Sequence, residues 1–236
     1  MKKIIFVTAL LFACGVSGYA QENTVEETTA EDAYESTSLI ISAGVASNTS
    51  PEINQNLKFS GLPQLNTTSF LLGIGYNVTS EKVLMDFEWE TAYMNEKKTE
   101  TDRVRTISTG AVLRIHYIPL RWKDKLVSGG LDLGYMYNQA DIYSRGRVID
   151  FNNLNPSAYT GHLSLYNNMF YVGPSASFGV WQGKGSGMRI VTGYRWGFGG
   201  KWKSEFAAIN NTVKENGTGQ FYAKIIINLG SLHFGS

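Results

Sequence analysis

The sequence predicts an all-β fold, a transmembrane antiparallel up-and-down β-barrel of eight strands. First, residues 82–94 alternate between large apolar side chains, such as Phe87 and Trp89, and polar ones that include three carboxylates. This period of two is that of a β-strand. Second, no run after residue 20 approaches the roughly 18 apolar residues of a spanning helix. Third, the connections between predicted strands alternate between short and long. A membrane barrel turns its apolar face to lipid and its polar face to the lumen, which accounts for these observations.

The first 20 residues have the features of a secretory signal peptide. Residues 1–3 (MKK) precede the apolar run 4–13, and residues 18–20 (GYA) form a small-x-small cleavage pattern. An alternative remains open, because residues 11–14 (LFAC) resemble a lipobox, and cleavage there would leave a lipidated Cys14. Cys14 is the only cysteine, so a chain cleaved after residue 20 has no disulfide. We therefore expect an exported protein without disulfide bonds.

Residues 21–35 are predicted to form an acidic, disordered periplasmic linker. The segment contains six acids and no base, namely Glu22, Glu26, Glu27, Glu31, Asp32 and Glu35. So many like charges with few apolar residues favour a solvated chain over a packed one. Loss of the signal peptide leaves 19 of the 21 basic residues against 20 acidic ones, a formal charge of −1. A nucleic-acid partner is not expected.

Eight stretches of about the 9–11 residues that a membrane-spanning strand needs, or somewhat more, follow the linker. In chain order they are residues 37–46, 68–77, 82–94, 104–118, 126–137, 169–181, 188–199 and 219–229. Each alternates apolar outward positions with small or polar inward ones. The inward positions are mainly serine and glycine in the first two strands and include charged side chains in the third, fourth, fifth, seventh and eighth. Pro174 lies on the lipid side of the sixth strand, where it removes a backbone donor.

The connections set the topology. Short connections are predicted at residues 78–81, 119–125 and 182–187, and long ones at 47–67, 95–103, 138–168 and 200–218. Short periplasmic turns and longer external loops are typical of outer-membrane barrels, and this phase places both termini in the periplasm. Residues 140–151 are compatible with an extra hairpin, so ten strands are the alternative. Residues 51–57 are compatible with one helical turn.

The inward positions carry the charges of the predicted barrel. They hold four acids, four bases and one histidine: Asp86, Glu88, Glu90, Asp132, Arg114, Arg189, Arg195, Lys224 and His116. One interpretation is an ion or proton path, or a carboxylate pair for acid–base chemistry. The other is a structural salt-bridge network, because an eight-stranded interior is only wide enough for side chains and isolated charges there are costly. We favour the network.

Aromatic residues predict where the membrane interfaces lie. The predicted girdle residues are Tyr76, Trp89, Tyr93, Tyr117, Trp122, Tyr135, Tyr137, Trp181, Trp196 and Phe198. Amphipathic rings prefer the level of the lipid headgroups, so they favour two girdles on the outer face of a barrel.

Evidence for catalysis is weak. His162 and Ser164 form a His-x-Ser pair that resembles part of the Ser, His and acid constellation of outer-membrane lipid A deacylases. Its acid would be Asp141 or Asp150, but no third group is evident to orient the base. No cluster of Cys and His has the spacing of metal ligands. We expect no enzyme activity, no metal and no cofactor.

The strand pattern and loop alternation of residues 36–234 resemble the small Gram-negative outer-membrane barrels of the OmpA/OmpX-like, porin-like class. The resemblance implies a barrel domain over residues 36–236 in the outer membrane, in contact with its lipids and lipopolysaccharide. It also implies insertion by the barrel-insertion machinery, with Phe234 in place of a terminal aromatic, and we expect a monomer. Basic residues near the long loops could contact lipopolysaccharide phosphates or be solvated: Lys97, Lys98, Arg103, Arg145, Arg147, Lys201 and Lys203.

The expected function is a structural or surface-interaction role through the long external loops. A narrow porin-like channel or lateral route for small molecules is the alternative, and a lipid-modifying enzyme is the third hypothesis. The sequence names no ligand.

Overall fold

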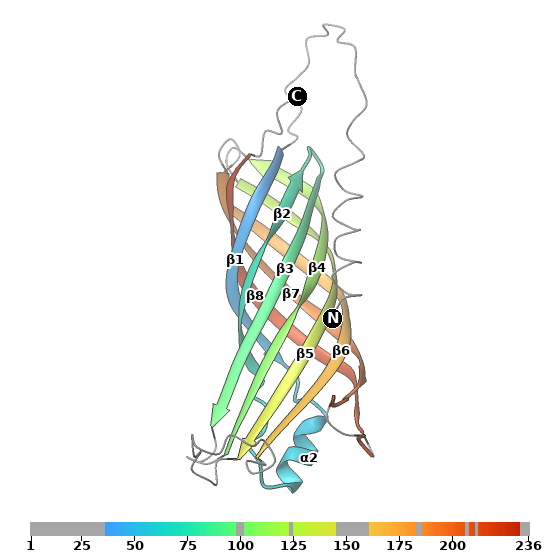
Figure 1. Ribbon diagram of the computed structural model, residues 1–236. Helices are drawn as coiled ribbons and strands as arrows, with labels where there is room; N and C mark the ends of the chain where they lie inside the picture. The colour runs from blue at the N-terminus through green and yellow to red at the C-terminus, as the bar shows by residue number, and fades with distance from the viewer. Residues whose placement is uncertain are drawn as a thin grey trace, which may run out of the picture. The chain divides into compact units, whose positions relative to one another are not determined.

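A computed structural model of the protein describes residues 36–97, 102–122, 125–144, 161–182, 186–205, 208–210 and 212–231. These residues form eight strands and one short helix, α2 (Ile53–Phe59) (Figure 1). The strands are β1 (Ser36–Asn48), β2 (Thr68–Thr79), β3 (Val83–Lys97), β4 (Asp102–Trp122), β5 (Lys125–Ser144), β6 (His162–Gln182), β7 (Ser186–Lys201) and β8 (Lys214–Ser231). The predicted signal peptide, the acidic linker and Phe234 lie outside the described residues.

The eight strands form a closed barrel. Each strand pairs antiparallel with its neighbour in sequence, and β1 pairs with β8 to complete the ring. Closure leaves no unpaired sheet edge, which a bilayer requires because it supplies no water to satisfy backbone groups. The predicted fold class and the number of strands are confirmed.

The ten-strand alternative is wrong. Residues 139–143 of β5 continue the ladder with residues 162–166 of β6 instead of folding back as a separate hairpin. The pairing persists because Ala140, Ile142 and Leu165 enter a buried apolar cluster at the mouth of the barrel. The predicted long loop at residues 95–103 is likewise mostly strand, since β3 reaches Lys97 and β4 begins at Asp102.

The barrel is apolar outside and polar inside. On β2, Phe70, Leu72 and Ile74 are more than half exposed, whereas the inward Ser69 and Leu71 are buried. The same alternation recurs around the ring, so apolar side chains cover the outer wall. An apolar surface this large is not stable in water, but it is the surface that a barrel presents to lipid.

The two ends of the barrel differ. Ser36 pairs with Thr79 and Ser38 pairs with Ser231, so the described chain begins and ends near the short connections. Figure 1 shows α2 at the opposite end, where the long connections emerge. No helix in the described part of the chain is long and apolar enough to cross a membrane.

Pro174 behaves as its chemistry requires. Its side chain is exposed on the outer face, and the β6–β7 ladder passes from Val172 directly to Ser175. The proline has no N–H to donate, so the ladder is interrupted at this point while the register on either side is preserved.

Candidate functional site

The interior of the barrel contains a compact cluster of charged residues. All nine polar residues predicted to face the lumen lie inside and are buried, and we call them the lumen cluster: Asp86, Glu88, Glu90, Arg114, His116, Asp132, Arg189, Arg195 and Lys224. Four acids face four bases, so the cluster is neutral in formal charge when the histidine is uncharged. Balanced pairing is what makes so many buried charges tolerable.

Asp86 and Asp132 are each held by two arginines. Arg114 Nη1 lies 2.7 Å from Asp86 Oδ2, and Arg189 contacts the other Asp86 oxygen. Arg114 Nε also lies 3.1 Å from Asp132 Oδ1, while Arg195 Nε lies 3.1 Å from Asp132 Oδ2. Arg114 therefore bridges two carboxylates, which links the pairs into one network.

The acids of β3 reach across the lumen. Lys224 Nζ of β8 lies 2.7 Å from both Glu88 Oε2 and Glu90 Oε2. Arg195 Nη1 of β7 lies 3.1 Å from Glu90 Oε1. Arg114 of the adjacent β4 pairs with Asp86 and, at a longer 3.8 Å, with Glu88. Glu88 and Glu90 both use bases from the far wall, so their side chains fill the cross-section.

His116 sits beside the ion pairs without joining one. Its Nδ1 lies 2.9 Å from Ser128 Oγ and its Nε2 lies 2.7 Å from Ser175 Oγ. Ser175 in turn donates to Asp132 at 2.6 Å. The histidine thereby extends the hydrogen-bonded network toward the short-turn end of the barrel.

Two inward glycines give these long side chains room. A β-carbon on Gly73 would collide with the carboxylate of Glu88, and one on Gly193 would collide with the ring of Tyr222. Arg195 stacks on that ring, with its guanidinium carbon 4.1 Å from the ring centroid. The small residues of the lumen are therefore matched to large neighbours rather than lining an open path.

The predicted girdle residues point outward. Most are exposed, namely Trp89, Tyr93, Tyr117, Trp122, Tyr135, Trp181, Trp196 and Phe198, while Tyr76 and Tyr137 are half-buried. Trp89 is opposite Ile74 and Ala111, midway along the strands rather than at either end of the apolar belt. The role of the others as interface anchors stays a prediction.

At the end with the long connections, a segment folds inward over the mouth. Residues 49–67, which include α2, form what we call the cap. Three of its apolar side chains, Ile53, Leu57 and Leu65, are buried against the inner wall. The wall contributes Val104, Ala140, Ile142, Leu165 and Trp202. Strands β4, β5 and β6 extend far enough to provide this surface.

A buried glutamate fastens the cap. Glu215 of β8 is 1% exposed, and its carboxylate accepts hydrogen bonds from the backbone N–H groups of Glu52 and Ile53 at 2.9 and 3.0 Å. Its Oε1 also accepts from Trp202 Nε1 at 2.8 Å. The carboxylate thus satisfies free donors at the start of α2, where negative charge is favourable.

The cap is also braced internally. Asn54 donates to the carbonyl of Leu65 at 3.0 Å and accepts from the Leu65 N–H at 2.7 Å, which joins the two arms of the segment. Sequence reasoning missed Glu215, Trp202 and Asn54, because all three fall in stretches predicted to be loops. An isolated acid just before the apolar alternation of the last strand was the only signal for Glu215.

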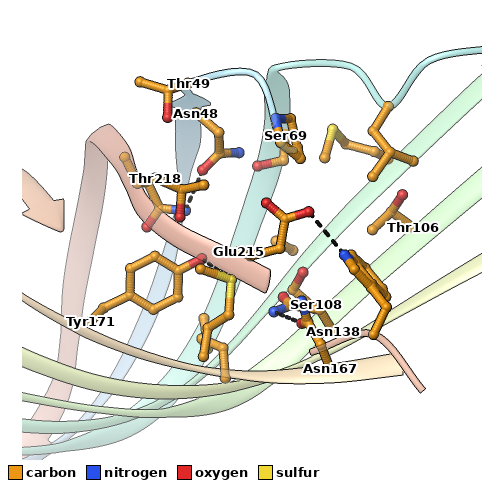
Figure 2. A pocket seen from close by; sticks show the side chains of 18 residues that line it. Asn48, Thr49, Ser69, Thr106, Ser108, Asn138, Asn167, Tyr171, Glu215 and Thr218 are labelled. Atoms are coloured by element: carbon orange, nitrogen blue, oxygen red, sulfur yellow. Dashed lines mark hydrogen bonds between the residues drawn. The ribbon is translucent and has the colours of Figure 1, made fainter. Parts of the chain in front are cut away.

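A small cavity lies between the lumen cluster and the cap, and Figure 2 shows the side chains that line it. Its volume is about 70 Å³. The cap contributes Thr49, Pro51 and Leu65 to its lining. Gln220 also lines it and is 3.4 Å from Arg195 Nη1 of the lumen cluster. The interior therefore consists of a charged layer, a small cavity and an apolar closure, in that order from the middle of the barrel to its mouth.

His162 and Ser164 lie at the start of β6, and the structure brings Asp141 next to both. Asp141 Oδ1 is 3.4 Å from His162 Nε2, and Asp141 is opposite Ser164 in the ladder. Gln139 Nε2 donates to Ser164 Oγ at 3.4 Å, whereas no described hydrogen bond joins Ser164 to His162. A nucleophile needs its base within hydrogen-bond reach. Here the acid lies where the base would have to be, so the three residues do not form a triad.

Asp141 instead pairs with Arg105, and the Asp141 side chain is buried while that of Arg105 is partly exposed. Arg105 Nη2 lies 2.7 Å from Asp141 Oδ2. Burial raises the pKa of the Asp141 carboxyl, but hydrogen bonds, from Arg105 foremost, outweigh it and lower the pKa to about 2. Tyr143 stacks on His162 with ring centroids 4.6 Å apart. Asp150 lies outside the described residues. In the described part of the chain, no group of three His, Cys, Asp or Glu residues is placed to hold a metal ion.

No family model and no curated protein matches the chain. Among solved structures it is similar to Ail, the attachment invasion locus protein of Yersinia pestis, at 8% identity and a TM-score of 0.49, covering 82% of this chain and 97% of that one. It is also similar to Neisserial surface protein A, at 11% identity and a TM-score of 0.41, covering 82% and 97%. A further similar structure is the outer membrane protease OmpT of Escherichia coli, at 11% identity and a TM-score of 0.30, covering 86% and 97%. At this level of likeness, the assignment as a barrel rests on the closed ring of strands, and function is argued from the site.

Proposed function

We propose that the protein is an outer-membrane barrel with an occluded lumen, and that it acts as a structural or surface-interaction protein through its capped end rather than as a channel. The single observation that supports this most is the lumen cluster. Its side chains, contributed by β3, β4, β5, β7 and β8, are fully or almost fully buried, and its four acids are paired with its four bases. The interior of an eight-stranded barrel is filled by side chains of this size.

The cap supports the same conclusion independently. It closes the mouth with an apolar cluster, whereas a channel entrance is expected to be wet and polar. Its outer face presents the helix α2, whose Phe59 is 88% exposed. Aromatic side chains on rigid elements are favoured anchors for partners. Exposed Lys201 and Lys203 at the same end add positive charge suited to lipopolysaccharide phosphates.

Conductance tests the occluded lumen. The purified protein in planar lipid bilayers is expected to give negligible current, and Arg114→Ala only a modest change, because the remaining side chains still obstruct the lumen. Steady, resolvable single-channel currents from the wild-type protein would promote the channel alternative.

Accessibility tests the orientation. An epitope tag inserted next to Asn56 in α2 should be reached by antibody on intact cells, and a tag near Lys184 only after permeabilisation. The reverse pattern would place the cap in the periplasm and contradict the proposed surface role.

A further inference from the structure

The cavity beneath the cap has polar atoms that lack a partner. Ser69 Oγ, Asn167 Nδ2 and Thr218 Oγ1 line it and are buried, yet they have no hydrogen-bond partner among the described residues. Ser69 is 3% and Asn167 is 2% exposed. Buried polar groups are nearly always hydrogen-bonded, since leaving one unpaired is costly. A guest in the cavity would supply the missing partners.

The orientation of the Asn167 amide defines which kind of hydrogen-bond partner it lacks. Its Oδ1 accepts a hydrogen bond from Asn138 Nδ2 at 2.8 Å, so its own N–H₂ group remains available as a donor. The hydroxyls of Ser69 and Thr218 can each donate or accept. The matching guest therefore has at least one acceptor, for Asn167, and further polar capacity for the hydroxyls.

The rest of the lining mixes polar and apolar side chains, and most of its surface is apolar. Met94, Met136 and Met169 contribute thioether side chains, which adapt readily to the shape of a guest. Glu215 is the only charged residue in the described lining, and its carboxylate already accepts three hydrogen bonds. No free charge remains to pair with an ion, so the site favours a neutral guest.

The volume of the cavity and its distance from the surface limit which guest molecules it can hold. A cavity needs roughly 10–15 Å³ to hold one water, so about 70 Å³ has room for a guest of only a few non-hydrogen atoms. Thr49 lines the cavity and is itself exposed, which brings the cavity close to the surface where β1 meets β8. We propose that the cavity binds a small uncharged molecule with a carbonyl acceptor beside a methyl-sized apolar group, of the class of short amides.

Acetamide is the probe that tests this. The mature protein, in detergent micelles and labelled with ¹³C at its methionine methyl groups, is titrated with acetamide up to roughly 100 mM, since so small a ligand binds weakly. Saturable shifts are expected for the methyl groups of Met136 and Met169. Met188, which does not line the cavity, serves as the internal reference. Acetate has the same shape but a negative charge, and it should give no saturable shift.

Three variants make the test specific. Ala92→Leu places a larger side chain in the cavity and should abolish the saturable shift. Ser69→Ala removes one of the unpartnered hydroxyls and should weaken binding roughly 3- to 10-fold. Ser38→Ala is the matched control, because Ser38 Oγ is also buried and unpartnered but lies away from the cavity, and binding should be unchanged.

Several results would overturn the proposal. These are shifts that stay linear, shifts that are equal for acetamide and acetate, or saturable binding that survives Ala92→Leu in a folded barrel. An equal loss of affinity for Ser38→Ala and Ser69→Ala would also refute it, and this comparison remains available if Ala92→Leu does not fold. A cavity that contains only ordered water, insensitive to acetamide, would assign the unpartnered atoms to water.

Discussion

Glu215 is expected to control whether the cap stays in the mouth of the barrel. Glu215→Gln keeps the size of the side chain but removes the charge and one acceptor. The remaining oxygen can still accept from Ile53 and Trp202, but the new amide N–H₂ then faces the N–H of Glu52, donor against donor. Hydrogen bonds to a charged group contribute about 1.5–3 kcal/mol each. Losing one and weakening the others should cost about 2–3 kcal/mol of cap stability.

This loss of cap stability corresponds to an increase in the open population of the cap that can be measured. With RT of about 0.59 kcal/mol, 2–3 kcal/mol raises the open fraction of the cap roughly 30- to 150-fold. Leu57 is 4% exposed inside the cap, so Leu57→Cys introduces a thiol that reacts with a maleimide only when the cap opens. The only natural cysteine, Cys14, lies in the predicted signal peptide, so the mature chain should carry a single label.

The assay compares labelling rates with and without Glu215→Gln. The rate at Leu57→Cys should rise by the calculated factor, while Gln55→Cys, on the exposed side of α2, should react equally fast in both backgrounds. Heat-induced unfolding of the barrel should be little changed, because the cap packs only at the mouth, whereas the strands within the membrane are held by their own ladders. Equal labelling rates at Leu57→Cys in the two backgrounds would contradict the role of Glu215 in holding the cap in place. A matching loss of barrel stability would show that Glu215 supports the wall instead.

Three further predictions concern the wall. Gly73→Ala forces a buried carboxylate of the lumen cluster to move and should cost about 1–3 kcal/mol of unfolding free energy in a urea titration. Gly129→Ala should be nearly neutral, because the added carbon meets only one atom, at 3.6 Å. Leu133→Arg places a charge in the middle of the lipid-facing belt and should cost roughly 2–4 kcal/mol in refolding titrations in vesicles, and an unaffected midpoint would argue against lipid contact there. Asp141 is held ionised by Arg105, so its contribution to folding stability is complete above its unfolded pKa of about 3.9 and is lost as the pH falls through about 2. The difference in stability between wild type and Asp141→Asn should therefore shrink over that pH window. A difference that stays constant would contradict the ion pair.

The barrel could be predicted from sequence because one physical rule governs the membrane part of every strand. Lipid outside and a packed lumen inside force apolar and polar side chains to alternate, as Phe87 and Glu88 do on β3. The opposite charges on the inward faces also indicated a network. Its partners could not be predicted, because the pairing of Glu90 with Arg195 depends on how far the long side chains reach across the closed ring.

The helical turn expected at residues 51–57 is present as α2 (Ile53–Phe59), but the inward fold of the cap and the strand ends could not be predicted. The reason is that the rule for side-chain polarity reverses where the surroundings change from lipid to water. Along β5, Leu133 and Tyr135 point outward, but above them Gln139 and Asp141 take the outward positions while Ile142 turns inward. The alternation continues with its polarity inverted, as in a sheet that faces water. A stretch with polar side chains facing outward does not match the pattern of a lipid-facing strand, so the sequence pattern predicts a loop there.

The lumen cluster has a consequence for how the barrel is assembled. The first five strands contribute Asp86, Glu88, Glu90 and Asp132 but only Arg114 to oppose them, whereas the last two strands contribute three bases. A partly formed sheet therefore carries an uncompensated negative face, and its charges are neutralised only when β7 and β8 arrive. Because isolated charges are costly to remove from water, a chain that lacks its last strands should stay outside the bilayer. Insertion of the barrel is therefore expected to depend on the presence of β7 and β8.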